Sequence, residues 1–402
     1  MSYVIDFGED KTGIYGVRFT NSYIGTRLLD ARGKVFTPSS TTQAGRDDFI
    51  NIKDSPFAIK ECVTKYNSST GKQDVISYEG DSNWSSALSD SFHNVMIEFP
   101  KFYYRRPSKW VWYVSSYQHD GFLPSPMHYR NGTMYDHVYV AKYGCNSNFT
   151  SQTGKTVDNE TSFQIYGTKN IGYYRNGFRS QGMYMWDYPL IMSLSMLMMV
   201  KYGSTDGQMT VGYGYSSSSN TGPLWTTGAS DQIKGKDGYA GSSISDNGAI
   251  KAFGIENYWG NYDKFIDGIV RYGSNRLYFN LDIESVTSLS HSGSGFVQFT
   301  STIAGGDINA YPTDITYDSN YPWVVCATSV GPNASDNNTH NNGKINDLYR
   351  SNTSNNKDQF MVFGGHYASG QNSGFFRQDT YGDDGRFTLS SPDLGACSFF
   401  FK

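Results

Sequence analysis

Residues 187–203 read D-Y-P-L-I-M-S-L-S-M-L-M-M-V-K-Y-G and form the clearest helical pattern in this sequence. Asp187 is a good N-cap, Pro189 fits a first helical turn, and Gly203 suits the position after the last turn. Leucine, isoleucine and tyrosine recur at helical spacing, and methionines occupy the other face. A helix that is apolar on all sides is buried, so we expect residues 188–202 to form a core helix.

The rest of the chain is poor in helix-forming residues. Of its 402 residues only 17% are charged, whereas 16% are aromatic, and there are 43 glycines and 32 tyrosines. Average proteins carry about 25% charged residues, and a chain rich in Tyr, Gly, Ser and Asn suits short strands joined by turns. The composition predicts an α+β fold that is mainly β, with few helices. The same residue types serve recognition loops, although they also fill an aromatic β core.

Short runs of β-branched and aromatic residues between turn signals predict strands. These runs are residues 15–19, 95–99, 102–104, 110–114, 138–141, 276–281, 295–303, 323–327 and 360–363. Asp54-Ser55-Pro56 looks like a helix start, so we expect a short helix that carries Phe57 to Val63. A second short helix is expected near Tyr262 to Ile266.

The pattern changes near residue 90, where a polar, turn-rich region gives way to strands. We therefore expect a small β-rich N-terminal region over residues 1–90 and one domain over residues 91–402. Two stretches within that domain, residues 212–248 and 331–358, are dominated by Gly, Ser, Tyr, Asn and Asp. They cannot bury enough apolar surface to form domains, and loops of this length are often functional.

Charge and cysteine usage exclude several classes of protein. The formal net charge is −4, so no basic excess indicates a nucleic acid or an anionic membrane as partner. Cys62, Cys145, Cys326 and Cys397 lie far apart, which argues against a zinc site or redox pair and for reduced thiols. The N-terminus has no signal-peptide pattern, and the most apolar stretch is too short to span a bilayer. We expect synthesis in a cytoplasm without membrane insertion.

No motif specifies an enzyme. The nucleophile elbow, the phosphate-binding glycine loop and the H-E-x-x-H motif are all missing. His119, His128 and His137 fit no metal spacing, residues 383–385 look like a turn tip, and residues 336–342 fit no EF-hand. We therefore expect no catalysis, no cofactor and no metal.

Two segments resemble a known family. Residues 254–267, G-I-E-N-Y-W-G-N-Y-D-K-F-I-D, resemble the "G-N-V-W-E-W" segment of C-type-lectin folds in their formylglycine-generating-enzyme-like branch. Residues 363–367, F-G-G-H-Y, resemble the "R-G-G-S-W" turn of that branch, and residues 395–400 are similar to its closing strand. The resemblance implies a C-type-lectin-like domain over the C-terminal part of the chain.

A second resemblance extends to most of the chain. Residues 95–104, V-M-I-E-F-P-K-F-Y-Y, are similar to the "V-M-V-E-I-P-K-F-Y-Y" strand of phage tail and virion proteins, and residues 15–18, 25–27, 66–72 and 78–80 resemble further segments of them. Such proteins are taken as components of host recognition or virion decoration. Some of them are diversified by a retroelement at the lectin surface.

This sequence also departs from the lectin-like relatives. The oxidases of that branch need a cysteine pair near the domain end, and no cysteine lies between Cys326 and Cys397. The calcium-dependent sugar motifs E-P-N, Q-P-D and W-N-D of animal lectins are missing as well. The resemblance therefore implies a binding protein, without oxidase activity and without a need for calcium in sugar binding.

These observations lead to a main hypothesis and two rivals. We expect a virion-surface adhesin, on the phage tail or head, that recognises a host glycan or protein and contacts other virion proteins. We also expect a homo-oligomer, with a trimer as one option. The first rival is a structural head- or tail-decoration subunit without receptor binding. The second is a polysaccharide-degrading tail enzyme, which no repeat pattern supports.

The candidate binding residues lie between the two C-terminal family segments, where aromatic, Arg and Asp side chains alternate with glycines. They are His366, Tyr367, Phe375, Phe376, Arg377, Asp379 and Tyr381. Tyr367, Arg377 and Tyr381 are expected at the energetic centre. The alternative is that Phe375, Phe376 and Tyr367 belong to the core, and Arg377 and Tyr381 then carry the prediction alone. If those two residues do not contribute to binding, the loop of residues 212–248 is the next candidate.

Overall fold

The computed structural model describes residues 12–159, 168–273, 275–333, 344–351, 357–381 and 391–402. The protein is mainly β, as the composition predicts, with 35% strand against 11% helix. The helices of the described part are α1 (Trp84–Leu88), α2 (Ile171–Ser180), α3 (Tyr188–Tyr202) and α4 (Gln208–Val211), with the 3-10 turns η1 (Ile283–Ser285) and η2 (Gly370–Asn372). The strands therefore carry the architecture.

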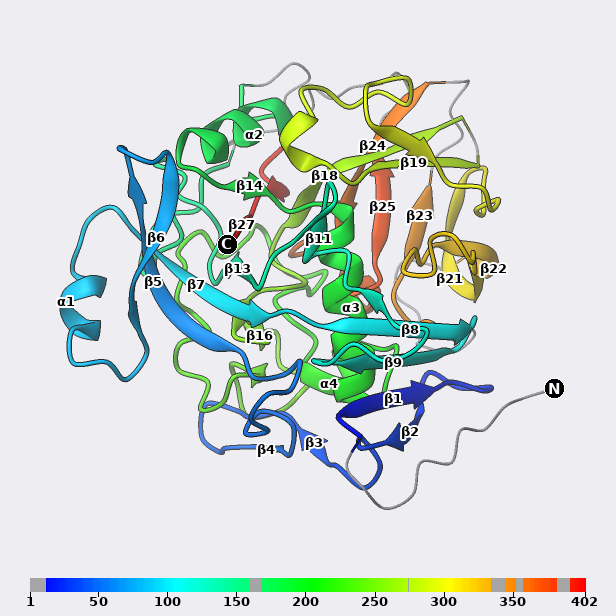
Figure 1. Ribbon diagram of the computed structural model, residues 1–402, viewed down its shortest axis with the longest axis horizontal. Coiled ribbons are helices and arrows are strands. Elements are labelled where there is room, and N and C mark those ends of the chain that lie inside the picture. Colours follow the sequence, from blue (N-terminus) through cyan, green and yellow to red (C-terminus); the bar gives the residue numbers. More distant parts are fainter. Residues whose placement is uncertain (1–11, 160–167, 274, 334–343, 352–356, 382–390) are drawn as a thin grey trace.

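Two antiparallel sheets hold most of the strands from the first half of the chain (Figure 1). One has the order β10-β8-β9-β1-β2, with β10 (Leu123–Pro124), β8 (Tyr103–Ser108), β9 (Val111–Ser115), β1 (Ile14–Arg18) and β2 (Thr26–Leu29). The other has the order β14-β27-β13-β7-β5-β6, with β14 (Tyr184–Met185), β27 (Ser398–Phe401), β13 (His137–Ala141), β7 (His93–Pro100), β5 (Lys60–Asn67) and β6 (Lys72–Tyr78). The chain end thus returns to a sheet built mostly from early strands.

A larger sheet holds most of the C-terminal strands. Its order is β20-β19-β18-β24-β25-β23-β21-β22, with β20 (Phe296–Gln298), β19 (Arg276–Asn280), β18 (Asp263–Tyr272), β24 (Asp358–Phe363), β25 (Gln378–Tyr381), β23 (Tyr349–Ser351), β21 (Ile308–Ile315) and β22 (Ala327–Asn333). Strand β26 (Leu394–Gly395) joins it by pairing with β18.

Smaller pairings complete the described strands. These are β3 (Phe36–Thr37) with β4 (Arg46–Asp47), β11 (Tyr129–Arg130) with β12 (Thr133–Met134), and β15 (Gly238–Tyr239), β16 (Ile250–Ala252) and β17 (Ile255–Glu256) in one small sheet.

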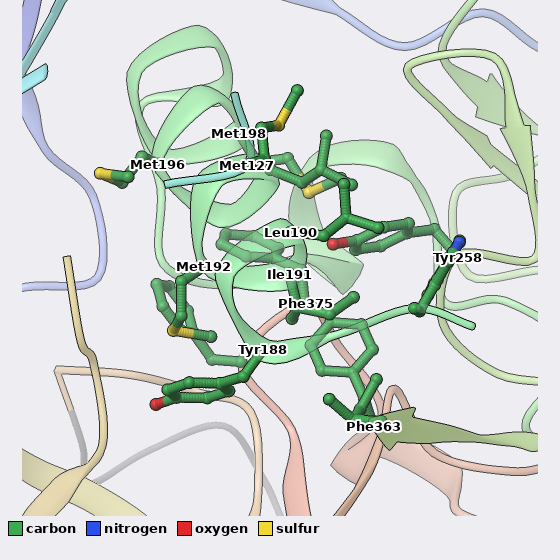
Figure 2. Packing of buried hydrophobic residues seen from close by; sticks show 14 of the residues in the cluster. Met127, Tyr188, Leu190, Ile191, Met192, Met196, Met198, Tyr258, Phe363 and Phe375 are labelled. Carbon is green, nitrogen blue, oxygen red and sulfur yellow. The ribbon is translucent and has the colours of Figure 1, made fainter. Parts of the chain in front are cut away.

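Helix α3 lies at the centre of the molecule, and its predicted bounds are confirmed. It spans Tyr188–Tyr202, the Asp187 side chain accepts from the Leu190 amide, and Gly203 ends it with a φ of 68°. All of its residues are buried. It contacts β1 and β9 on one side and β18 on another, and Figure 2 shows its leucine, isoleucine and methionine side chains packed against aromatic rings.

Two buried ion pairs connect α3 and α2 to the surrounding chain. The guanidinium of Arg130 binds both oxygens of Asp187, at 2.5 and 3.0 Å, while Asp187 also caps α3. Arg175 on α2 binds both oxygens of Asp267 on β18, at 2.7 Å each. Bidentate pairs of this kind fix orientation as well as distance, so both helices are held in register with their neighbours.

The helix expected from Asp54 to Val63 is wrong. Cys62 and Val63 lie in β5, which pairs with β6 and β7. Asp54 has a φ of 59° and so cannot act as an N-cap in extended backbone. The run Cys62 to Thr64 has strand preference, and pairing on both sides outweighs the start signal.

The helix expected at Tyr262 to Ile266 is also wrong, because residues 263–272 form β18 between β19 and β24. Sequence reasoning missed α2 instead. Its N-cap is Asn170, whose side chain accepts from the Tyr173 amide, and Arg179 lies in its last turn. The two glycines inside it hid the helical pattern, since glycine disfavours helix interiors.

Most predicted strands are confirmed, namely those at residues 15–19, 95–99, 102–104, 110–114, 138–141, 276–281 and 360–363. Two were misplaced: the strand expected over residues 295–303 is limited to β20, and the one over residues 323–327 begins only at Ala327 with β22. In the second case Trp323 and Val324 belong to the buried core rather than to a ladder.

Strand pairing crosses residue 90. β5 and β6 lie before this position and pair into the sheet of β7 and β13, and β1 pairs with β9. The structure therefore gives no physical break at the expected boundary. The expected role of residues 1–90 in virion attachment stays a prediction.

Replacing Asp187 with alanine should lower the free energy of unfolding by about 3–5 kcal/mol, because Arg130 would be left buried without its partner. Asp136→Ala is the matched control, since Asp136 pairs with Lys101 at the surface with 66% of its side chain exposed. The control substitution should lower the free energy of unfolding by at most about 1 kcal/mol. Denaturant titration measures both, and equal losses would contradict the proposed importance of the Asp187 pair.

Candidate recognition surface

The predicted binding residues fall into two groups. His366 and Tyr367 follow β24 and are half-buried, with their rings 5.4 Å apart. Phe375, Phe376, Arg377 and Asp379 are at most 4% exposed. The backbone of Tyr381 pairs with Phe360, and its side chain lies outside the described structure. Among the candidates whose side chains the structure describes, only His366 and Tyr367 lie at the surface.

Phe375 and Phe376 belong to the core, so their expected role in binding is wrong. The Phe375 ring lies 6.2 Å from that of Trp259, and its carbonyl accepts a hydrogen bond from Ser195 of α3. Both rings are part of the cluster that surrounds α3. The alternative that these two residues pack rather than bind is the one the structure supports.

Arg377 and Asp379 form a buried pair beneath the surface, which corrects the expectation that they contact a receptor. Arg377 Nη2 lies 3.3 Å from Asp379 Oδ2. Desolvation raises the pKa of Asp379 to about 6, while the charge of Arg377 acts in the opposite direction. Arg377 directly precedes β25 and Asp379 lies within it, and with 3% and 1% exposure neither residue is accessible to a partner in this structure.

Three loops gather around His366 and Tyr367, and we call them the loop platform: residues 213–225, 242–247 and 366–372. Asn247 Oδ1 accepts from the amides of Ser216 and Ser217, at 3.0 and 3.1 Å, and from Asn220 Nδ2. Asn220 Nδ2 also donates to the Tyr367 carbonyl at 2.8 Å. Side-chain amides therefore tie the three loops into one surface.

Asn261 is the hub beneath the loop platform. Its side chain binds both the amide and the carbonyl of Leu224, at 2.6 and 3.2 Å. Its backbone donates to the Tyr215 carbonyl and accepts from the Tyr367 amide. With a φ of 66° it holds a left-handed conformation that asparagine tolerates better than most residues. One residue thus positions two of the three loops.

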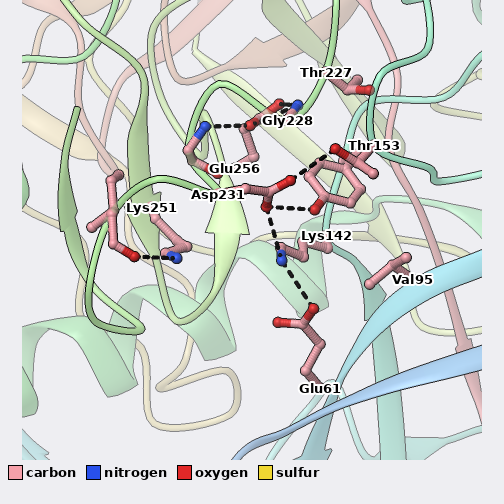
Figure 3. A network of polar contacts seen from close by, with 12 residues as sticks. Glu61, Val95, Lys142, Thr153, Thr227, Gly228, Asp231, Lys251 and Glu256 are labelled. Carbon is pink, nitrogen blue, oxygen red and sulfur yellow. Dashed lines mark hydrogen bonds and ion pairs between the residues drawn. The ribbon is translucent and has the colours of Figure 1, made fainter. Parts of the chain in front are cut away.

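A polar network anchors the segment that follows the first platform loop (Figure 3). Asp231 lies 3.1 Å from the ammonium of Lys142 and accepts from the hydroxyl of Tyr143. Lys142 also binds Glu61 of β5 at 2.9 Å. Glu256 accepts from the amides of Gly228 and Ser230. The segment is therefore fixed to the sheet of β5, β7 and β13.

A second anchor joins the same segment to α3. Lys201 Nζ, at the end of the helix, lies 2.5 Å from Asp237 and 2.6 Å from Asp47. Tyr202 donates its hydroxyl hydrogen to Asp237 as well. Because Lys201 and Asp237 are each only 1% exposed in their side chains, this pair is desolvated and costly to break.

The loop platform carries aromatic, hydroxyl and amide groups and little charge. Ser218, Ser219, Thr221, Trp225 and Asn247 are exposed. Its three ranges contain no lysine or arginine, and the carboxylate of Asp246 is taken up by the amides of Ser242 and Ser243. Such a surface suits neutral partners recognised by ring stacking and hydrogen bonds.

Burial favours the neutral form of His366. Desolvation lowers its pKa, against the opposing charge of Asp263. Its Nδ1 accepts from the Ala368 amide at 3.3 Å, which leaves the ring hydrogen on Nε2. His366 can therefore offer one N–H donor on a ring that lies edge-to-face with the ring of Tyr367.

Two of the three platform loops lie within residues 212–248, the alternative binding segment predicted from the sequence. The Gly-, Ser- and Tyr-rich composition of this segment pointed to a binding role, but its distance from Tyr367 in the sequence hid their closeness in the fold.

Within the described residues, no cluster of three or more His, Cys, Asp or Glu is placed to hold a metal. All four cysteines are buried and form no disulfide. None of the helices in the described part is long and apolar enough to cross a membrane. Residues 336–342, which fit no EF-hand, and the turn expected at residues 383–385 lie outside the described residues.

Comparison with known proteins gives few matches. No known family and no curated protein matches the chain. Solved structures of the Major Tropism Determinant M1, U1 and P3c variants align with 98% of this chain and 85% of theirs, at 11%, 10% and 10% identity. Their TM-scores are 0.31, 0.31 and 0.30. Scores of this size do not establish a common fold, and no assignment of fold or function follows from them.

Changing Asn261 should loosen the loop platform without unfolding the protein. Asn261→Gly keeps the left-handed backbone but loses both bonds to Leu224, so the Leu224 amide should exchange faster in hydrogen-exchange experiments. Asn261→Ala should show the same faster exchange and cost about 1 kcal/mol more in unfolding free energy, because alanine disfavours this φ. The control is Asn51→Ala at an exposed asparagine. If the hydrogen exchange of the Leu224 amide is unchanged in both variants, the proposed role of Asn261 in holding the platform loops is refuted.

Asp379 should make stability depend on pH in a specific direction. Because its folded pKa of about 6 exceeds the ordinary value near 3.9, the folded state binds a proton that the unfolded state releases. The stabilisation is therefore complete below about pH 4 and is lost as the pH rises through about 6. Between pH 4 and pH 7, the free energy of unfolding of the wild type should fall relative to that of the Asp379→Asn variant. A difference that is constant over this range would contradict the raised pKa.

Proposed function

We propose that this chain is a virion-surface protein of a bacteriophage and that it binds a host-cell receptor through the loop platform. The observation that carries the proposal is the platform itself, in which irregular loops with aromatic and amide groups are fixed by Asn247, Asn261 and buried ion pairs. Recognition needs variable side chains on a rigid scaffold, and preorganised loops lose less entropy on binding.

The sequence resemblance of residues 95–104 to phage tail and virion proteins supports the phage origin, and the segments at residues 254–267 and 363–367 support a C-type-lectin-like domain. Both family segments contribute residues to the loop platform or its support: the first contains Asn261, and the second contains His366 and Tyr367. Under this proposal the protein acts by binding and not by catalysis. Its partner is a glycan or protein of the host surface, and the chain assembles as a homo-oligomer with other virion proteins.

The rival proposal, a structural decoration subunit, draws support from apolar side chains outside the platform. Ile24 and Phe92 are 64% and 59% exposed in the first hundred residues, as a contact with another virion protein would require. The two roles are compatible if these side chains face the virion and the platform faces the host. They differ in whether platform substitutions affect attachment to cells.

Tyr367→Ala and Trp225→Ala should each weaken binding of the purified protein to host cells by roughly 1–2 kcal/mol, since aromatic side chains dominate binding hot spots. The melting temperature should change little, because Tyr367 is half-buried and Trp225 is 39% exposed. The matched control is Tyr117→Ala, at a 53% exposed tyrosine outside the platform. Flow cytometry with labelled protein measures the binding.

Arg377→Ala should behave differently and lower stability, because Asp379 would lose its buried partner. Wild-type attachment by both platform variants would count against receptor binding at this surface and favour the decoration role.

A further inference from the structure

A polar cavity lies in the C-terminal sheet, outside the loop platform. It has a volume of about 240 Å³ and is lined by Asn275, Arg276, Gln298, Phe299, Thr300, Ser301 and Thr302. It forms where β19 begins and β20 ends. After Gln298 the chain makes one more backbone bond, from the Phe299 amide to the Leu277 carbonyl, and then curves back until the Ile303 amide meets the Asn275 carbonyl. The curve leaves a hollow beside the strand ends.

Side chains along β19 and β20 point alternately to the two faces of the sheet, and this alternation decides which groups face the hollow. Tyr278 pairs with Gln298 and Phe279 with Val297, so neighbouring side chains along each strand point to opposite faces. Leu277 and Phe299 are 0% and 2% exposed on the core face. Arg276 and Thr300 are exposed on the other face, as is Gln298. The cavity thus presents one guanidinium, two amides and three hydroxyls.

Three of the polar lining residues, Gln298, Thr300 and Ser301, are held by hydrogen bonds to their neighbours. Tyr278 donates to Gln298 Oε1 at 3.0 Å, which leaves the amide N–H groups of Gln298 to face outward. Thr300 and Ser301 both donate to Asp318, whose carboxylate also accepts the amide of Asn320. The hydroxyl oxygens of Thr300 and Ser301 therefore keep lone pairs for a ligand. A lining that mixes fixed donors and acceptors matches the alternating hydroxyls of a sugar.

Arg276 is the one charged residue that lines the cavity, and the carboxylate of Asp318 lies behind the hydroxyls of Thr300 and Ser301. The Arg276 guanidinium lies over the Tyr272 ring, 6.0 Å from the ring centre. Within the described residues no carboxylate lies in ion-pair distance of it, and none is among the lining residues. An arginine that has no acidic partner favours carboxylate or phosphate groups, which it binds with two parallel hydrogen bonds.

From these features we propose that the cavity binds one anionic sugar residue, with Arg276 on its acidic group and Asn275, Gln298 and Thr300 on its hydroxyls. The volume is below the roughly 300–1,000 Å³ of sites that enclose drug-sized ligands, so one ring fits and a longer oligosaccharide extends outside. The biological meaning rests on the proposed receptor-binding role: an acidic glycan of the host surface would have a second contact besides the loop platform. The acidic group belongs to a uronic acid or to a sugar phosphate.

The test uses ligand-observed NMR titrations of the whole protein with methyl glucuronide, glucose 6-phosphate and neutral methyl glucoside. At least one acidic probe should bind about tenfold or more tightly than methyl glucoside, as a charge-assisted contact predicts. Arg276→Ala should reduce the affinity for the acidic probe to that for methyl glucoside. Gln298→Ala should weaken the acidic and the neutral probe alike. Arg32→Ala, at an exposed arginine elsewhere in the chain, is the matched control and should bind as the wild type does.

The outcomes separate the sources and the proposals. Preference for the glucuronide indicates a uronic acid, and preference for the phosphate indicates a phosphorylated sugar. The proposal is overturned if no acidic probe binds, if the neutral probe binds equally well, or if a folded Arg276→Ala protein binds as the wild type does. The two proposals can also fail separately. If Arg276→Ala loses sugar binding while Tyr367→Ala attaches to cells normally, the sugar site in the cavity is supported and the loop platform is refuted as the receptor site.

Discussion

Complete burial of helix α3 is the constraint on which the rest of the structure depends. A helix with no exposed residue needs covering layers on every side, and the chain supplies them with β1 and β9, with β18, and with the core aromatic residues around Tyr258 and Phe375. The hydrophobic effect favours this arrangement strongly, because each large apolar side chain contributes about 1.5–3 kcal/mol when it is fully buried. Strands from both ends of the sequence must therefore meet around one helix.

Burial of the helix ends has a polar consequence. Asp187 at the first turn and Lys201 at the last would be unpaired charges in the interior without Arg130, Asp47 and Asp237. Asp237 belongs to the long segment that leads away from the first platform loop. Because Lys201 at the end of α3 needs an acidic partner, its ion pair with Asp237 fixes that segment. Asn261 and Asn247 fix the platform loops before and after it. The surface that we assign to recognition is rigid because the core beneath it is.

Local sequence signals predicted those parts of the fold in which the capping residues, the spacing of apolar residues and the burial in the structure all favour the same element. The ends of α3 could be read from Asp187, Pro189 and Gly203, and β7 from its β-branched run. The signals failed where pairing with distant strands decides the outcome: Cys62 and Val63 lie in β5 despite a helix-start pattern, and Tyr262 leads into β18. Arg377 shows the same limit for the binding site. An arginine among glycines looks like a contact residue, and only the folded chain shows that it is enclosed with Asp379.

The central claim is that the loop platform is where the protein meets its host. Hydrogen-exchange mass spectrometry of the protein, with and without cell-envelope fragments of the host, tests this claim most directly. The account predicts slower exchange in peptides that cover residues 213–225, 242–247 and 366–372, because contact excludes water from their exposed amides. Protection confined to peptides from the first hundred residues, with the platform peptides unchanged, would contradict it.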